Sequence, residues 1–180
     1  MINAGEQAAA REKTLGYFNR AGIVLTDDEK ENIEIADFGL NDLKNIGLEL
    51  VVYINTAKVC AKELVLFPWQ TCPEHRHPQI NGRPGKEETF RCRSGLVYLY
   101  LEGEKNCSPQ LHGLEKYQEH LKVAHEVVLR PGEQYTLPPD TKHWFRAGAD
   151  GAVVSEFSTP STDECDIFTD PRIERITKIE

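Results

Sequence analysis

The amino-acid sequence predicts a mainly β domain, a sandwich or barrel of short strands, preceded by a helical extension. Three observations predict this fold class. After residue 47, β-branched and aromatic residues gather in short runs typical of strands. Turn-forming pairs such as Asn81-Gly82 and Pro131-Gly132 separate those runs. The first 47 residues instead contain two helix-capping patterns. We therefore expect one domain over residues 1–180, with a helical extension at 1–47 and a β-barrel at 48–180.

The extension begins with Asn3 and Glu6, whose spacing is that of a capping box, followed by a run of helix-forming residues to Phe18. A second capping box, from Thr26 to Glu29, predicts a second helix that reaches about Ile35. A short helical turn over 41–46, ending at Gly47, completes the expected extension.

The strands are predicted from runs of β-branched, aromatic and aliphatic residues. Their residues are 48–54, 63–67, 96–101, 126–130, 134–137, 143–147 and 152–158. The segment 107–125 interrupts the series, and we expect it to form a loop with a short helix. Many short strands with few helices are typical of a sandwich or barrel.

Charge and hydrophobicity exclude several classes of function. The chain has 21 Lys and Arg against 29 Asp and Glu, so its net charge is −8. Such a surplus of carboxylates repels both nucleic-acid phosphates and anionic membranes. No apolar run approaches the roughly 18 residues that a membrane-spanning helix needs. The first 13 residues contain no continuous apolar stretch, so we expect no secretory signal.

The five cysteines are widely spaced and form no C-x-x-C pair. This pattern is neither a disulfide framework nor a zinc knuckle. We expect reduced thiols in a cytoplasmic protein.

The candidate site rests on pairs of polar residues two positions apart. In a strand, residues i and i+2 point to the same face, so His75 and His77 would present two imidazoles together. Paired imidazoles of this kind commonly hold a divalent metal. Lys86 and Glu88 share a face for the same reason, and His143 follows a proline-rich turn further along the chain.

The order of these residues resembles the two signature motifs of the cupin superfamily. H-x-H is followed by Glu88 and, after six residues, by Gly95; Gly132 and Pro138 then precede His143 in the pattern G-x5-P-x4-H. The resemblance implies a cupin-type antiparallel jelly-roll barrel that holds one metal through His75, His77, Glu88 and His143. Two features depart from the cupin pattern. Ten residues separate His77 from Glu88, more than is usual, and Asp140 stands where a glycine is common.

A closer resemblance, from about Trp69 to the C-terminus, is to the D-lyxose isomerases, a cupin family of sugar isomerases. It is carried by residues 74–78, 85–92, 95–100, 156–159, 163–164, 166, 168 and 170–173. The long spacing before Glu88 also favours this family. The resemblance implies manganese as the metal and a homodimer. It also implies interconversion of D-lyxose and D-xylulose, with D-mannose and D-fructose as a second pair.

Aldose–ketose isomerisation explains why such residues are needed. A metal that binds both reacting oxygens polarises the carbonyl and stabilises negative charge on them. Three His and one carboxylate leave two positions of an octahedron open, which suits Mn²⁺, Fe²⁺, Co²⁺ or Ni²⁺ better than a closed zinc site, although Zn²⁺ is an alternative.

A general base must also move a proton between neighbouring carbons. We expect Glu156, on a strand after that of His143, to be this carboxylate. Lys86, with a pKa lowered by a nearby dication, is expected to be its acid or electrostatic partner. The sequence leaves the two roles reversible and leaves Glu164 or Asp166 as alternative partners.

Two other functions compete with this hypothesis. The same set of three His and one Glu can activate oxygen at iron in a cupin dioxygenase or oxidase. A non-catalytic sugar-binding cupin would keep the barrel alone. Lys86 favours the isomerase, because neither alternative needs an acid–base pair that relocates hydrogen on carbon.

Overall fold

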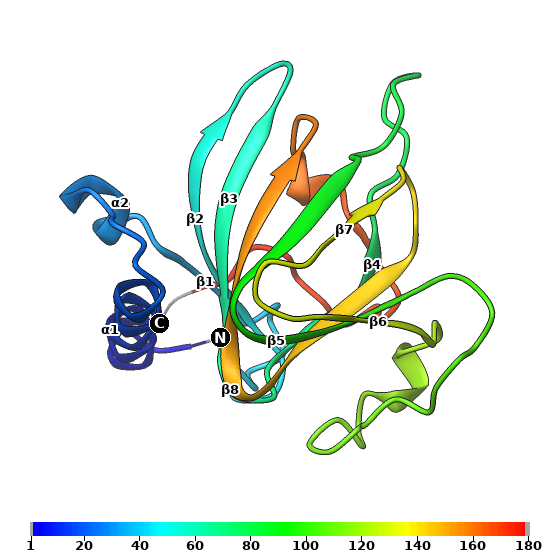
Figure 1. Cartoon of the computed structure of the whole chain (residues 1–180), viewed down its shortest axis with the longest axis horizontal. Coiled ribbons are helices and arrows are strands. Elements are labelled where there is room, and N and C mark those ends of the chain that lie inside the picture. The colour runs from blue at the N-terminus through cyan, green and yellow to red at the C-terminus, as the bar shows by residue number, and fades with distance from the viewer. Residues whose placement is uncertain (1, 179–180) are drawn as a thin grey trace.

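The computed structural model describes residues 2–178 and has the expected mainly β architecture (Figure 1). Two helices, α1 (Ala4–Arg20) and α2 (Asp27–Glu31), come first. The strands are β1 (Glu34–Ala36), β2 (Leu48–Asn55), β3 (Cys60–Leu66), β4 (Thr71–Arg76), β5 (Glu88–Leu101), β6 (His125–Leu129), β7 (Gln134–Leu137), β8 (His143–Ser158) and β9 (Ile167–Phe168). Two 3-10 turns, η1 (Gln118–His120) and η2 (Asp163–Cys165), lie in the connections.

Both helices begin as their capping patterns predict. The Asn3 side chain accepts a hydrogen bond from the Glu6 backbone at 2.9 Å, and the Glu6 carboxylate accepts one from the Asn3 backbone at 2.9 Å. Thr26 and Glu29 form the same reciprocal pair at the start of α2.

The second helix is shorter than the sequence predicts. It ends at Glu31, and the prediction of a helix to about Ile35 was wrong, because residues 34–36 form strand β1 and pair with β2. Ile33 and Ile35, two positions apart, both pack into the apolar cluster beneath α1. The edge of β2 provides backbone hydrogen-bond partners for residues 34–36. The extension therefore contains a strand of the sheet, and the domain division at residue 47 stays a prediction.

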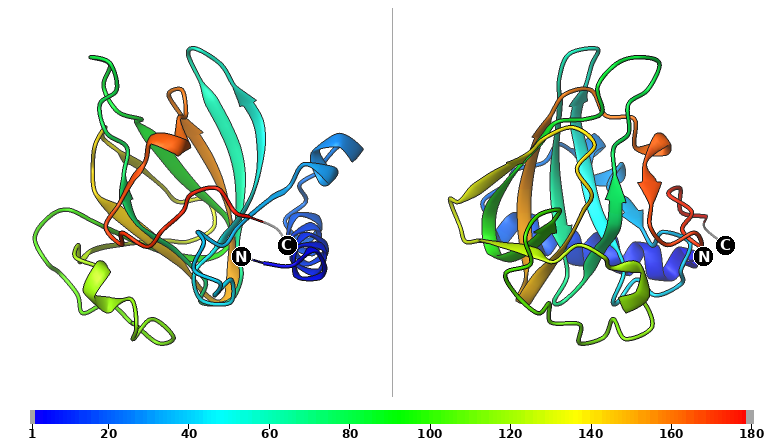
Figure 2. Two further views of the ribbon diagram at one scale, coloured as in Figure 1. Left: turned by 180° about the vertical axis from the view of Figure 1, so that it is seen from behind. Right: turned by 90° about the vertical axis from the view of Figure 1, so that its right-hand side faces the viewer.

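The nine strands within residues 2–178 belong to one antiparallel sheet that curls around an interior (Figures 1 and 2). The neighbouring strands run β1-β2-β3-β8-β4-β9, while β5 pairs with β6, β7 and β8. The segment after β8, coloured orange to red, passes across the open side of the curl from β4 toward β1 (Figure 2). It pairs with β4 through β9 and reaches the Phe38 carbonyl through the Glu174 backbone N–H at 3.0 Å.

Strand β8 pairs with β3, β4 and β5 and so connects the parts of the sheet. The sequence predicts two strands, 143–147 and 152–158, separated by a turn, whereas the structure joins them in one strand of 16 residues. Two glycines, Gly95 of β5 and Gly151 of β8, lie where these strands cross, and both have positive φ. A Cβ on Gly95 would lie 2.0 Å from the Gly151 carbonyl oxygen, so the close approach of the two strands requires glycine there. One half of β8 pairs with β3 and the other with β4, so residues from distant strands meet inside the curl.

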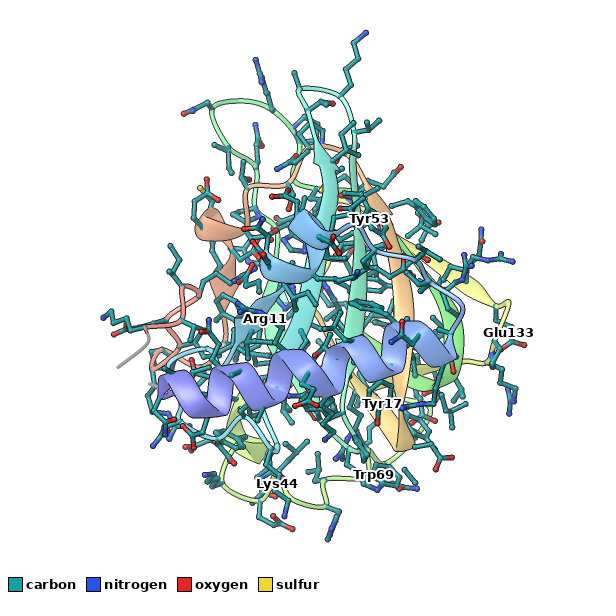
Figure 3. The ribbon with its side chains drawn as sticks, turned by 90° about the vertical axis from the view of Figure 1, so that its left-hand side faces the viewer. Arg11, Tyr17, Lys44, Tyr53, Trp69 and Glu133 are labelled. Atoms are coloured by element: carbon teal, nitrogen blue, oxygen red, sulfur yellow. The ribbon has the colours of Figure 1, made fainter. Side chains whose placement is uncertain are left out.

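Helix α1 covers the outer face of β2, β3 and β8 (Figure 3). Its Phe18 packs with Val51, Val65 and Val153 in a cluster separate from the barrel interior. Because strand residues alternate between faces, Leu50 and Leu64 belong to the interior cluster instead.

The segment 102–124 leaves the barrel as the expected loop with one short helix, η1. Buried Arg146 donates to the carbonyls of Trp69 at 2.8 Å and His112 at 3.1 Å. The Glu74 carboxylate accepts from the Lys122 and Val123 backbones at 2.6 and 2.9 Å. These contacts fix the loop against the barrel.

All five cysteines are free thiols, as expected. Within residues 2–178, no helix has the length and apolarity needed to cross a membrane.

Candidate metal centre and active site

Three histidines meet inside the barrel. His75 lies near the end of β4 and pairs with His143, the first residue of β8, while His77 follows β4 directly. All three side chains are buried, and one ring nitrogen of each lies within 4.8 Å of the others. The structure thus brings together the three imidazoles that the sequence predicts as metal ligands.

The surrounding acceptors orient the three rings in the same way. Each Nδ1 faces an oxygen: the Pro73 carbonyl at 2.8 Å for His75, the Thr141 carbonyl at 3.0 Å for His143, and the Asp166 carboxylate at 2.5 Å for His77. Because these oxygens accept hydrogen bonds, Nδ1 carries the proton and Nε2 is the nitrogen available to a metal.

Glu88, the first residue of β5, brings a carboxylate to this cluster. Its Oε1 lies 3.0 Å from His77 Nε2 and 3.1 Å from His143 Nε2. Its Oε2 lies 2.8 Å from the Lys86 ammonium. Glu87 is exposed between them, so Lys86 and Glu88 share the inner face as their spacing predicts.

These residues fit a divalent metal. Among the described residues, the buried Nε2 of His143 makes no hydrogen bond, although it lies close to Glu88. A buried nitrogen without a hydrogen atom to share is costly unless it binds something. Three imidazole nitrogens and one carboxylate match the mixed donor set that Mn²⁺, Fe²⁺, Co²⁺ and Ni²⁺ accept.

The pKa values of the histidines differ because their neighbours differ. Burial lowers the pKa of His75 well below its usual value, and the two other histidines lower it further. Burial also acts on His77, but Glu88 and Asp166 outweigh it and raise the pKa of His77 to about 9. Since a metal binds only the deprotonated nitrogen, binding at His77 must release that proton.

Glu156 points into the barrel next to the histidine cluster. It lies on β8, is 4% exposed, and its Oε1 accepts a hydrogen bond from the Lys86 ammonium at 3.1 Å. The Lys62 ammonium lies 3.7 Å from the same oxygen, because Lys62 of β3 is the direct cross-strand neighbour of Glu156. The sequence-predicted pair, Lys86 and Glu156, is therefore in contact.

The carboxylates around Lys86 oppose the lowering of its pKa that a nearby dication would cause. Burial lowers the pKa, but Glu156, Glu88 and Asp163 together outweigh it and raise the pKa of Lys86 well above its usual value. Glu88 and Glu156 were expected beside Lys86, whereas Asp163 reaches it only through the fold of the segment after β8.

The loop between His77 and Lys86 explains the unusual spacing of the first motif. Residues 78–84 extend beyond the barrel as a turn closed by hydrogen bonds between Ile80 and Arg83. The chain returns at Gly85, where a Cβ would lie 1.9 Å from the His77 carbonyl oxygen. Glycine is thus needed there to bring Lys86 beside His77. At the second motif, Asp140 adopts φ of 62°, the turn conformation that a glycine would otherwise supply.

One small central cavity is lined by His75, His77, Glu88 and the Lys86–Glu156 pair. Its remaining wall is largely apolar and includes Phe38, Leu50, Phe90 and Phe145. Of the two alternative partners, Asp166 lines the cavity and holds His77, whereas Glu164 is exposed and lies outside it.

Comparison with known proteins gives this geometry a family. Residues 24–180 match the D-lyxose isomerase family. The chain belongs to the D-lyxose isomerase family. It is 58% identical over 180 residues to the D-lyxose/D-mannose isomerase of Thermosediminibacter oceani, covering 100% of this chain and 99% of that protein. It is 57% identical over 175 residues to the D-lyxose ketol-isomerase of Cohnella laeviribosi, covering 97% and 96%. Its relatives are thus isomerases acting on an aldose.

Solved structures agree with the fold of this D-lyxose isomerase family member. The L-ribose isomerase of Cellulomonas parahominis superposes with a TM-score of 0.78 at 16% identity, over 99% of this chain and 98% of that chain. The L-ribose isomerase of Acinetobacter sp. DL28, solved in complex with L-ribose, gives a TM-score of 0.79 at 16% identity with the same coverage. At this identity the likeness concerns the fold, a cupin-like barrel.

Three charged cavity residues of this D-lyxose isomerase family member are absent from the predicted site residues: Lys62, Asp163 and Arg175. Lys62 starts the alternation that continues with inward-facing Leu64 and Leu66, so the period of β3 could have indicated its direction. Asp163 and Arg175 lie in irregular segments after β8, where no periodicity reports the direction of a side chain.

Proposed function

We propose that this chain is a metal-dependent aldose–ketose isomerase that interconverts D-lyxose and D-xylulose, with D-mannose and D-fructose as a second pair. The observation that carries the proposal is the contact between Lys86 and Glu156 beside three convergent, buried histidines. A dioxygenase has no need of such a pair, and the names of the relatives favour isomerisation over oxygen chemistry.

His75, His77, His143 and Glu88 would hold the metal, for which we propose Mn²⁺. When bound, a divalent ion polarises the sugar carbonyl and stabilises the negative charge that develops on the reacting oxygens. Asp166 and the carbonyls of Pro73 and Thr141 keep the imidazoles turned toward the ion-binding position.

Glu156 and Lys86 would divide the proton transfers between carbon and oxygen. Glu156 removes the proton from C2 of the open-chain aldose, while the Lys86 ammonium donates a proton to O1, which gives the enediol. Glu156 then returns its proton to C1, and Lys86 recovers a proton from O2 as the C2 carbonyl forms. All atoms and charges balance, and both groups end as they began.

The contacts favour this assignment over the reverse. Lys86 faces the carboxylates of Glu88, Glu156 and Asp163, which stabilise its ammonium form and suit it to donate rather than accept a proton. Asp166 is engaged with His77, so it would act through that ligand rather than on the sugar.

The decisive experiment follows D-lyxose in D₂O with protein loaded with Mn²⁺, Co²⁺ or Ni²⁺ in turn. We expect D-xylulose to form and deuterium to appear at C2 of the recovered aldose. No ketose with any of these metals would refute the isomerase. Ketose without deuterium would refute exchange at an accessible base and favour a hydride shift or a shielded proton.

A homodimer is proposed from the family resemblance alone. Sedimentation equilibrium of the purified chain should give twice the monomer mass, and a monomer at micromolar concentration would contradict it.

A further inference from the structure

Asp163 and Arg175 lie between the central cavity and a cleft on the surface. They line the central cavity and also an open surface cleft of about 410 Å³, whose other residues are Gln7, Glu34, Ile35, Glu164, Ile176 and Thr177. Of the described residues, Asp163 and Arg175 alone line both hollows. The pair therefore stands where the cavity would continue into the cleft.

Strong contacts hold the pair in this position. The Arg175 guanidinium pairs with Asp163 at 3.2 Å on one side and with Glu34 of β1 on the other. Asp163 in turn lies 2.6 Å from the Lys62 ammonium and 3.9 Å from that of Lys86. The Arg175 and Asp163 side chains are only 15% and 21% exposed.

The backbone around Arg175 is also fixed. The Glu174 backbone N–H donates to the Phe38 carbonyl at 3.0 Å, and Thr177 accepts a hydrogen bond from the Asp37 backbone at 3.0 Å. The segment is thus docked against the residues that follow β1, although it forms no strand there. Because these contacts lie outside the strands, a substitution in this segment leaves the strand register of the barrel unchanged.

We propose that Asp163 and Arg175 form the far wall of the sugar site and determine the length of aldose that the enzyme accepts. This inference rests on the proposed function. The histidine cluster and the Lys86–Glu156 pair fix the end that contains C1 and C2. The rest of an open-chain sugar must extend away from that end, and the polar side of the cavity leads along Lys62 to Asp163.

The chemistry of the pair suits the terminal hydroxyl groups of a sugar. A carboxylate accepts hydrogen bonds and a guanidinium donates them, so together they satisfy both sides of a hydroxyl. D-lyxose and D-mannose have the same configuration from C2 to C4, and D-mannose is longer by one CHOH unit. With Arg175 in place the cavity ends at the pair, which favours the pentose, whereas the cleft beyond provides the space that a hexose needs.

The test is a comparison of kcat/KM for D-mannose and D-lyxose in the wild-type enzyme and in Arg175→Ala. We expect the mannose-to-lyxose ratio to rise about tenfold, the lower end of the discrimination that one extra carbon unit provides in a fitted pocket. Glu164→Ala is the matched control, because Glu164 lines the cleft but not the cavity, and its ratio should equal that of the wild type.

A second variant guards against poor folding of Arg175→Ala. Glu34 lines the cleft and contacts Arg175 but is outside the cavity, so Glu34→Gln loosens the arginine without changing the cavity wall. Its ratio should move in the same direction by a smaller factor. An unchanged ratio in both active variants, or in Glu34→Gln alone if Arg175→Ala does not fold, would overturn the inference.

Calorimetric binding of D-arabinitol and D-mannitol, the polyols obtained by reducing D-lyxose and D-mannose, separates this inference from the proposed function. Arg175→Ala should gain affinity for the hexitol relative to the pentitol. A wild-type protein that converts neither aldose would refute the proposed function. The ratio of hexitol to pentitol affinity would still show whether Asp163 and Arg175 limit the length of the bound polyol. Wild-type activity with unchanged ratios would refute the wall alone.

Discussion

The curled sheet buries carboxylates on both of its faces, but the partners of these carboxylates differ between the two faces. Inside the barrel, Glu88 and Glu156 each lie within 3.1 Å of the Lys86 ammonium. On the outer face, beneath α1, Glu49 is fully buried and accepts a hydrogen bond from the Gln70 amide at 2.9 Å. Its second oxygen has no hydrogen-bond partner among residues 2–178.

The two environments favour different protonation states. Burial raises the pKa of Glu49 to about 8, and neither the Gln70 hydrogen bond nor the charge of Lys13 offsets it, so the acid is mostly neutral at pH 7. Inside, burial also raises the pKa of Glu88, but Lys86, His77 and His143 outweigh it and lower the pKa well below its usual value.

This difference shows what each face is built for. Buried ion pairs add little stability, because desolvation consumes much of the attraction between them. A cluster of paired charges in the barrel is therefore better explained by chemistry than by folding. The outer face avoids the cost by keeping its acid protonated.

The largest effect on turnover should come from Glu156→Gln. Glutamine keeps the size of the side chain but cannot accept a proton, so kcat for D-lyxose should fall by about 10²- to 10⁴-fold. Metal content per chain should remain that of the wild type. Glu87→Gln, which changes the exposed carboxylate beside Glu88, should leave kcat unchanged. Loss of metal in Glu156→Gln would place Glu156 among the metal ligands and contradict its assigned role.

His143→Ala should break the histidine cluster itself. We expect metal affinity, measured by equilibrium dialysis, to fall by more than about 100-fold, because even the outer partners of metal ligands contribute 10- to 100-fold. His125→Ala is the control, since His125 lies on β6 and contacts the Glu104 carbonyl instead. Normal metal affinity in His143→Ala would remove His143 from the centre.

Asp166→Ala distinguishes a positioning residue from a base. If Asp166 only orients His77, metal affinity should fall by about 10- to 100-fold and excess metal should restore kcat. A low kcat that excess metal does not restore would instead make Asp166 the base, the alternative that the sequence leaves open.

The outer face should affect stability and leave turnover almost unchanged. Between pH 4.5 and about 8 the unfolded chain ionises Glu49 while the folded chain keeps it protonated. The folded state thus binds more protons, and the free energy of unfolding should fall by up to about 1.4 kcal/mol per pH unit as the pH rises. Glu49→Gln should remove this slope between pH 4.5 and 6.5, below the range in which His77 contributes, as measured by urea unfolding at several pH values.

Glu12→Gln, an exposed change on α1, should keep the wild-type slope. A slope that survives in Glu49→Gln would mean that other groups cause it. A loss of kcat in Glu49→Gln would show that the two faces are coupled.

The sequence by itself determined the features that depend on short spacing. The capping boxes located the starts of both helices, and runs of β-branched residues located most strands. The i, i+2 rule predicted that His75 and His77 share a face, and that Lys86 and Glu88 do, because strand geometry repeats every two residues. The motif order nominated His143, and a place on a late strand nominated Glu156.

Only the tertiary structure decided what pairs across long separations. The register of β3 against β8 places Lys62 opposite Glu156, 94 positions away in the chain. The path of the final segment places Asp163, Asp166 and Arg175 at the cavity, and the edge of β2 turns the predicted end of the second helix into β1. Such pairings depend on backbone hydrogen bonds and burial between distant segments, which local propensity does not encode.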